Sequence, residues 1–362
     1  MGEIPVDQET VSRDWFVQRT VRARFVAPSG DLSERPIQIR THPITGRTCR
    51  IAFSRIEEEE AGIDRLPEPP PDARQIERCP FCRPQVLDRT PRLAAHIHPD
   101  GRMVRGEALL FPNLFPYGAY SAVSLFDNAH FVEIGTASAH SYADCLINCA
   151  DYLKRVIQYD PAAIHMAITQ NHLPSAGGSM VHPHLQIQAD RVAANHHRGL
   201  LARARAYRRA TGRNLLSDYV ARESRSGERI IGRTGPWLWL AAFAPEGFFE
   251  IWAVFSGCSS ILAVAEQDWR HLAAGMIRVQ QFYRSLNRNG YNFGLLSVET
   301  PQSALELRAV MLVRSNYAPW TRSDHTGFEV MLGDMATFSA PEETARLARA
   351  FWPANAGHRM EG

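Results

Sequence analysis

Two histidines and a glutamine alternate along one predicted strand, in the stretch SAGGSMVHPHLQIQAD at residues 175–190. Side chains two residues apart point to the same face of a β-strand, so His182, His184 and Gln186 would form one polar row. Val181, Leu185 and the residues around them supply apolar contacts. Burying three polar side chains is costly unless each has a partner. The row is therefore either a solvent-facing polar edge or a set of ligands and catalytic groups.

The composition excludes several classes of protein. The chain has 362 residues, 45% of them apolar, and a formal net charge of +2. This balance is typical of a globular protein of about two domains, and it argues against nucleic-acid and membrane partners. The first ten residues, MGEIPVDQET, contain no apolar segment, so we expect no signal peptide. The six cysteines form no dense framework, which favours a reducing cytoplasm.

Helix and strand signals alternate along the chain. The spacing predicts helices over 138–161, with Ser138 or Ser141 as N-cap, over 195–214 and over 266–290. Short strands are expected between them, including two strands joined at APEG within 237–257. The order of these elements indicates a duplicated α+β unit with a boundary near residue 195. Before it, the acidic and proline-rich run EEEEAGIDRLPEPPPDAR favours an exposed, poorly ordered loop.

A CxxC pair lies in RCPFCRP at residues 78–84. Thiolates and imidazoles are natural ligands of tetrahedral zinc, and one CxxC supplies half of such a site. The chain has no second CxxC, so further ligands would come from histidines such as His96, His98, His130 and His182. The first two lie in a turn that is typical of surface residues. A redox pair or two incidental thiols are the alternatives, and the redox pair lacks a thioredoxin-like βαβ setting.

The opening stretch also contains the parts of a phosphate-transfer site. An imidazole can attack an electrophile and form a covalent intermediate, once a hydrogen bond or a metal nearby fixes its tautomer. The small residues of SAGGSM leave backbone N–H groups free to hold phosphate oxygens, and the Gln186 amide can donate to an oxyanion. No Ser/His/Asp order is legible, so phosphoryl or nucleotidyl transfer fits better than acyl transfer.

Three longer stretches resemble a known family. NHLPSAGGSMVHPHLQIQAD, with ERCPFC and FPNLFPYGAYSAVSLFDNAH before it, is similar to the galactose-1-phosphate uridylyltransferases of the histidine-triad superfamily. The likeness covers most of residues 75–345, and HPHxQ is its specific motif. It implies an α+β fold of two histidine-triad-like halves, each an antiparallel half-barrel sheet flanked by helices. Residues 1–75 would be an N-terminal extension, 76–194 the catalytic and zinc-binding half, and 195–362 the second half.

The resemblance also implies roles for individual residues. His184 would be the nucleophile of a double displacement through a nucleotidyl-histidine, with Gln186 and Ser179 on the phosphate. The zinc ligands would be Cys79, Cys82, His130 and His182. The substrate-binding residues would be Asn113, Leu114, Phe115, Asn171, Gly177, Gly178, Phe328 and Glu329. A glutamine where triad hydrolases have a third histidine is typical of the transferase branch.

The second half departs from the family pattern. A His-x-Glu/His-x-Tyr-Pro-Pro type segment is expected at the sugar site, but residues 308–330 read RAVMLVRSNYAPWTRSDHTGFEV. The glutamine expected shortly after Glu329 is also absent. Nucleotidyl transfer is therefore supported, and galactose is not. Arg314 and Arg322 are candidate partners for the phosphate or carboxylate of another acceptor, or else form surface ion pairs.

We therefore expect a cytoplasmic, zinc-containing nucleotidyltransferase that works as a homodimer. It would move a nucleoside monophosphate between a nucleotide sugar, or a related nucleotide, and a phosphate-bearing acceptor. One alternative is a phosphorylase or hydrolase of nucleotide sugars or dinucleotides with the same intermediate. The other is a nucleotide-binding protein that has lost turnover, against which the intact HPHLQ argues.

Overall fold

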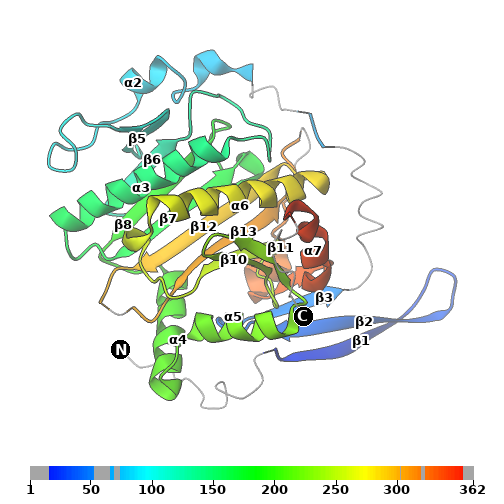
Figure 1. Ribbon diagram of the computed structural model, residues 1–362. Helices are drawn as coiled ribbons and strands as arrows, with labels where there is room; N and C mark the ends of the chain where they lie inside the picture. Colours follow the sequence, from blue (N-terminus) through cyan, green and yellow to red (C-terminus); the bar gives the residue numbers. More distant parts are fainter. Residues whose placement is uncertain (1–15, 53–65, 69–73, 302, 319–322, 354–362) are drawn as a thin grey trace, which may run out of the picture.

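A computed structural model describes residues 16–52, 66–68, 74–301, 303–318 and 323–353 (Figure 1). Its main feature is one continuous antiparallel sheet of ten strands, in the order β4-β5-β6-β8-β7-β12-β13-β11-β10-β9. The strands of the first half are β4 (Met103–Arg105), β5 (Ala108–Pro112), β6 (Tyr120–Leu125), β7 (His165–His172) and β8 (His184–Asp190). Those of the second half are β9 (Ile230–Thr234), β10 (Trp237–Ala241), β11 (Phe248–Phe255), β12 (Gly290–Val298) and β13 (Leu307–Arg314).

The two halves repeat the same strand arrangement and meet where β7 pairs with β12. The α+β fold and its two halves are as the sequence predicts, including the two strands on either side of APEG. The two half-sheets are joined into a single sheet. Strand β8 ends at Asp190 and α4 begins at Asn195, and the domain division at residue 195 stays a prediction.

Helices α3 (Ala139–Tyr159) and α6 (Glu266–Ser285) lie side by side across one face of the sheet (Figure 1). Their apolar sides share one core with alternate residues of the strands, among them Leu185 and Ile187 of β8. The Ser138 hydroxyl accepts hydrogen bonds from the N–H groups at the start of α3, which confirms Ser138 as the N-cap. This packing leaves His184 and Gln186, which alternate with Leu185 and Ile187, on the opposite face.

The opposite face is covered over the second half by α4 (Asn195–Thr211) and α5 (Leu215–Ser226). Leu200 of α4 and Leu216 of α5 are buried in one cluster with Leu240 and Trp252 of the sheet. The arginines of α4 are largely on its exposed side. This face is therefore apolar under α4 and α5, and polar where the first half contains the histidine strand.

A second, four-stranded sheet has the order β1-β2-β3-β14, where β14 runs parallel to β3. Its strands are β1 (Gln18–Val26), β2 (Leu32–Thr41), β3 (Thr48–Ala52) and β14 (Met335–Thr337). Helix α7 (Pro341–Ala348) is tied to it by an ion pair from Glu342 to the buried Arg40, with 2.9 Å between the charged atoms. The N-terminal strands thus pack with the C-terminal part of the chain. The predicted loop EEEEAGIDRLPEPPPDAR lies mostly outside the described residues.

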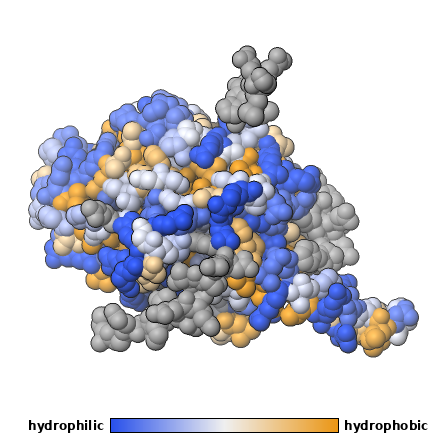
Figure 2. All heavy atoms as spheres, turned by 60° about the horizontal axis from the view of Figure 1, so that its bottom comes forward, coloured by the Kyte–Doolittle hydropathy of each residue, from blue (hydrophilic) through white to orange (hydrophobic). Residues whose placement is uncertain are grey.

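The β1–β2 hairpin projects from the body of the molecule (Figure 1). Its tip exposes Val26 and Leu32 (Figure 2). The short elements complete the fold: α2 (Gln85–Arg89) and the single turns η3 (Ile76–Arg78), η4 (Pro174–Ala176), η5 (Ile261–Ala263), η6 (Phe328–Leu332) and η7 (Arg349–Phe351). In the part of the chain that the structure describes, no helix has the length and apolar character needed to cross a membrane.

Candidate metal and catalytic site

Cys79, Cys82, His130 and His182 converge in one buried cluster, and their ligand atoms all lie within 4.8 Å of one another. The cysteines follow the turn η3, and His182 lies two residues before β8. His130 lies in the loop between β6, which ends at Leu125, and α3.

The distances in the cluster fit a tetrahedral metal ion. The Nδ1 atoms of His130 and His182 lie 3.2 and 3.5 Å from the Sγ atom of Cys82, and the His182 Nδ1 atom lies 3.8 Å from that of Cys79. Zinc bonds of ~2.3 Å to sulfur and ~2.0 Å to nitrogen place such ligands about 3.5 Å apart. His96 and His98 do not belong to the cluster, in agreement with their expected place in a surface turn.

The protonation chemistry of the cluster also suits a metal. Burial and the neighbouring Cys79 raise the pKa of Cys82 to about 12, and burial lowers the pKa of His182 to about 4. Without a cation, the thiol is therefore neutral and an unprotonated imidazole faces it. A divalent metal would deprotonate such a thiol and use the imidazole lone pair. The residues therefore fit a metal with soft sulfur and nitrogen ligands.

His184 is the first residue of β8 and is 5% exposed, and His182 is 1% exposed. These values exclude a solvent-facing polar edge. The predicted polar row of His182, His184 and Gln186 is interrupted, because His182 precedes β8 and belongs to the cluster of cysteines and histidines. The His184 Nδ1 atom lies 2.8 Å from the His182 carbonyl oxygen. Since a carbonyl only accepts, Nδ1 carries the proton and the lone pair is on Nε2 of His184.

Phe81, inside the CxxC loop, connects the cluster to this histidine. Its ring lies edge-on to the rings of His182 and His184, with centroids 6.0 and 5.4 Å away. Burial lowers the pKa of His184, so the ring is held neutral. Sequence reasoning missed Phe81, although its position between the two cysteines was the available signal. The CxxC loop thus both supplies metal ligands and packs against the His184 imidazole.

A hydrogen-bond network fixes the amide of Gln186. The Asn171 Nδ2 group faces the Gln186 Oε1 atom at 3.5 Å, and Asn292 Nδ2 donates to Asn171 Oδ1 over 2.6 Å. Arg314 Nη1 in turn donates to Asn292 Oδ1 over 2.7 Å, and Asp324 pairs with that arginine at 2.7 Å. With its oxygen facing Asn171, Gln186 keeps its N–H groups available for an oxyanion.

Asn292 was not predicted as a site residue, because it lies on β12 in the second half, where no motif marks it. Strand pairing places it opposite Asn171. Arg314 was predicted either to bind the acceptor or to form surface ion pairs. Its guanidinium donates hydrogen bonds to Asp324 and Asn292. Arg322 lies outside the described residues.

The loop between β7 and β8 contains the glycines of the motif. Gly177 has φ of +89°, which favours glycine, and Leu173 has φ of +71°, which is costly for a branched side chain. A Cβ atom on Gly178 would lie 2.9 Å from the carbonyl oxygen of Asn171. These constraints hold the loop close over the end of β7. Ser179 is exposed on it.

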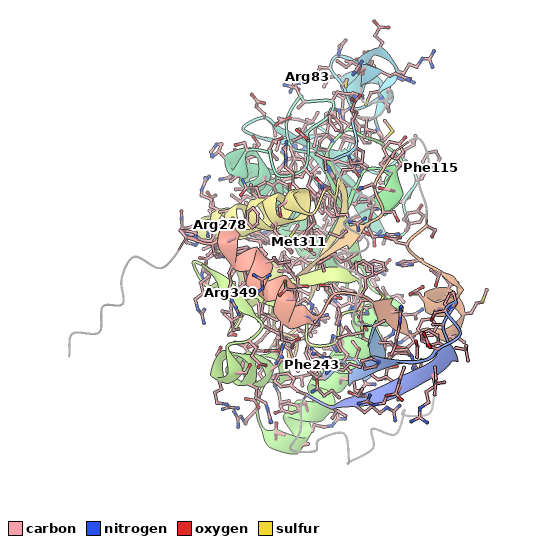
Figure 3. The ribbon with its side chains drawn as sticks, turned by 90° about the vertical axis from the view of Figure 1, so that its right-hand side faces the viewer. Arg83, Phe115, Phe243, Arg278, Met311 and Arg349 are labelled. Atoms are coloured by element: carbon pink, nitrogen blue, oxygen red, sulfur yellow. The ribbon has the colours of Figure 1, made fainter. Side chains whose placement is uncertain are left out.

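The remaining predicted residues lie in two places. Asn113, Leu114 and Phe115 follow β5, and the two apolar side chains are 62% and 74% exposed. Figure 3 shows Phe115 at the edge of the molecule. Phe328 and Glu329 form the start of η6, beside β14 of the smaller sheet. No hydrogen bond or ring contact between described residues joins them to the His184 group.

No protein-family model matches the chain. An uncharacterized protein of Archaeoglobus fulgidus is 26% identical over 342 residues, which cover 92% of this chain and 98% of that protein. Among solved structures, an ADP-glucose phosphorylase from Arabidopsis thaliana with bound ADP-glucose is similar, with a TM-score of 0.67 and 19% identity. A uridylyltransferase is similar with a TM-score of 0.63 and 19% identity. Each comparison covers 86% of this chain and 98% of the other, and both show a shared fold.

Proposed function

We propose that this chain is a zinc-containing nucleotidyltransferase of the galactose-1-phosphate uridylyltransferase type. It moves a nucleoside monophosphate from a nucleotide sugar, or a related nucleotide, to a phosphate-bearing acceptor. The observation that carries the proposal is that two groups lie on the same face of β8. One is the Nε2 atom of the buried His184, which carries the lone pair, and the other is the amide of Gln186, oriented by Asn171. A likeness in fold to a uridylyltransferase and to an ADP-glucose phosphorylase supports it.

The reaction follows from these two groups. Nε2 of His184 attacks the α-phosphorus, a P–N bond forms, and the bond to the leaving phosphate oxygen breaks. A phosphate oxygen of the acceptor then attacks the same phosphorus, and the P–N bond breaks. The N–H groups of Gln186 and the hydroxyl group of Ser179 stabilise charge on the phosphoryl oxygens. The backbone N–H groups of Ala176, Gly177 and Gly178 were expected to hold phosphate, but they donate to carbonyl oxygens within the loop. The exposed apolar side chains of Leu114 and Phe115 are available to contact the nucleoside.

Zinc in the cluster would be held by Cys79, Cys82, His130 and His182, and it would supply structural rigidity. The His182 carbonyl oxygen accepts from His184 Nδ1, so a fixed His182 also fixes the tautomer of the nucleophile. All six cysteines are free thiols, which supports the cytoplasm as the compartment.

Phe328 and Glu329 match the pair that holds the hexose in the resembled family. Within one chain they lie beside the smaller sheet, so we place them in the acceptor site of a second copy in a homodimer. Glu329 is held by the N–H and hydroxyl groups of Thr326, and its carboxylate is presented at the surface.

UDP-glucose with galactose-1-phosphate should be a poor substrate pair. Residues 308–330 lack the usual sugar segment, and the guanidinium of Arg314 is already bound by Asp324 and Asn292. We expect exchange of the uridylyl group between these two sugars to be at least a hundredfold slower than with the preferred acceptor. Coupled kinetics with each sugar phosphate measure this ratio, and efficient exchange with galactose-1-phosphate would refute the expected loss of galactose specificity.

A phosphorylase is the second candidate, with inorganic phosphate as the acceptor in the second step. The altered sugar segment is compatible with it, because the acceptor of the second step would then contain no hexose. Incubation with a panel of labelled nucleoside diphosphate sugars, without acceptor, tests the shared first step and identifies the base. Chasing the adduct with phosphate or with sugar phosphates then separates the two candidates by product. A protein that forms no adduct with any donor is not an enzyme of this type.

Asn292→Ala should reduce kcat by about fivefold, because a lost hydrogen bond in the network is worth about 1 kcal/mol and frees the Gln186 amide to rotate. Gln186→Ala should cost about a hundredfold, since preorganised donors contribute about 3 kcal/mol. Asn195→Ala, an exposed asparagine at the start of α4, is the matched control. Steady-state kinetics with the preferred donor measure kcat for the wild type and the three variants. Wild-type turnover in Asn292→Ala would remove the network from the mechanism.

A further inference from the structure

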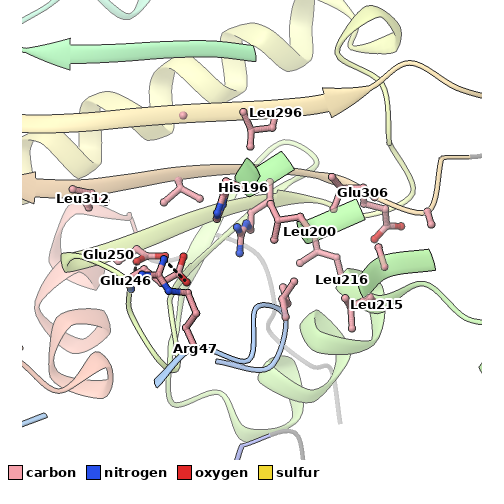
Figure 4. A pocket seen from close by; sticks show the side chains of 17 residues that line it. Arg47, His196, Leu200, Leu215, Leu216, Glu246, Glu250, Leu296, Glu306 and Leu312 are labelled. Carbon is pink, nitrogen blue, oxygen red and sulfur yellow. Dashed lines mark hydrogen bonds and ion pairs between the residues drawn. The ribbon is translucent and has the colours of Figure 1, made fainter. Parts of the chain in front are cut away.

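The second half contains a cavity of about 310 Å³ on the same sheet face as His184, between the sheet and helices α4 and α5. Its apolar wall includes Leu200 of α4, Leu216 of α5, and Leu296 and Val310 of the sheet. Arg47, Glu246 and Glu250 are grouped on one side of the cavity, and Glu306 lies on the other side, near Leu215 and Leu216 (Figure 4). The Glu306 carboxylate accepts from the Ser217 hydroxyl and the Gly257 N–H group. This volume is in the range of small-molecule sites.

The register of the sheet shows which position of the first half corresponds to this cavity in the second half. The segments FPNLFPYGAYSAVSLF and LAAFAPEGFFEIWAVF align along β5–β6 and β10–β11, with Pro and Gly at matching positions. In this alignment Leu125 corresponds to Val254. Leu125 pairs with His184, and Val254 pairs with Arg308. Arg308 therefore takes, in the second half, the place that the nucleophile has in the first.

Arg308 has unused hydrogen-bonding capacity. Its Nη1 atom is buried and has no hydrogen-bond partner among the described residues. Its guanidinium carbon lies 4.2 Å from the ring centroid of Trp252, so a cation–π contact holds the group beside that ring. A buried guanidinium without a full set of acceptors is costly, and an anionic ligand would supply them.

The neighbouring carboxylates do not replace such a ligand. Glu250 accepts from the Trp252 indole and from the Glu246 N–H group, and Glu246 faces Arg47 and the Thr45 hydroxyl. Burial, to which Glu246 adds, raises the pKa of Glu250 to about 7. Glu250 and Glu246 also attract Arg308 electrostatically. They would repel a phosphate dianion more strongly than the single charge of a carboxylate, which one guanidinium fork can bind.

We propose that this cavity binds a small monocarboxylic acid, with its carboxylate on Arg308 and its apolar body between α4, α5 and the sheet. The site is separate from the His184 group, because β7 and β12 lie between β8 and β13. With strands ~4.8 Å apart, that separation is about 14 Å. The inference does not depend on the chemistry at His184.

Calorimetric titration of the full chain with octanoate and with 1-octanol tests the proposal. Octanoate should bind at least tenfold more tightly, because only it offers a partner to Arg308. Arg308→Met keeps the length and apolar character of the side chain, and it should reduce that preference to below twofold. Arg225→Met, which changes an exposed arginine of α5, is the matched control and should behave as wild type.

A second variant fills the cavity and leaves the charge of Arg308 unchanged. A Cβ atom on Gly294 would have no neighbour within 4 Å, and Gly294 lines the cavity, so the side chain of Gly294→Leu would extend into the cavity. It should weaken octanoate and 1-octanol alike by at least tenfold and leave the unfolding temperature unchanged or higher. No heat of binding at millimolar octanoate, an unchanged preference in Arg308→Met, or wild-type binding in a folded Gly294→Leu would each overturn the proposal.

Discussion

His184→Ala should leave no covalent label on the protein after incubation with a labelled nucleotide donor. In the wild-type chain, Nε2 of His184 carries the lone pair because Nδ1 donates to the His182 carbonyl oxygen over 2.8 Å. An alanine removes the nitrogen atom that we propose forms the P–N bond, so turnover should fall to the background rate. His140→Ala is the matched control, because the His140 side chain is 72% exposed on α3, which covers the opposite face of the sheet from His184.

The chemistry of the bond gives an independent check. A phosphoramidate survives base and is cleaved by acid, whereas a phosphate ester on serine is stable in acid. We expect the label to persist through a basic quench and to be lost in acid, and mass spectrometry to place it on the peptide that contains His184. Label that remains in His184→Ala, or that survives acid, would remove this histidine from the mechanism.

The candidate site was largely predictable, because its parts lie in short motifs with a period or a spacing. The alternation in HPHLQ predicts that His184 and Gln186 share a face, but β8 starts at His184 and not at His182 as expected. The CxxC pair and two histidines meet in one cluster, as the resemblance implied. The motif could not show that His182 turns out of the row. That depends on where the strand begins, and Pro183 lies between the two histidines.

The long-range features were not predictable from local patterns. The pairing of β7 with β12 joins the halves into one sheet and places Asn292 beside Asn171. Nothing near Asn292 in the sequence indicates this, because strand partners are chosen by packing of whole elements. The parallel pairing of β14 with β3 is equally non-local. The cavity beside Gly294 depends on the distance of α4 and α5 from the sheet, which hydrophobic periodicity does not determine.

Cys82→Ser should remove the metal from the purified protein and destabilise the first half. The Cys82 Sγ atom is the central contact of the cluster, within 3.5 Å of both histidine Nδ1 atoms. Metal analysis should find about one zinc per wild-type chain, as a four-ligand site implies, and almost none in the variant. Cys258→Ser is the matched control, because Cys258 is a free thiol outside the cluster.

The expected loss of stability follows from what the four ligands do without a metal. The raised pKa of the Cys82 thiol and the lowered pKa of His182 leave these two groups held by weak contacts, whereas a bound zinc ion would join the CxxC loop, the His130 loop and the residues before β8. Losing several kcal/mol of binding energy should lower the unfolding temperature by roughly 10 °C. Chelation of the wild-type protein should reproduce this shift, and Cys82→Ser should then show no further response to chelator. Equal zinc content in Cys82→Ser and Cys258→Ser would exclude the cluster as the metal site, and an unchanged unfolding temperature after zinc loss would mean that packing alone holds these segments together.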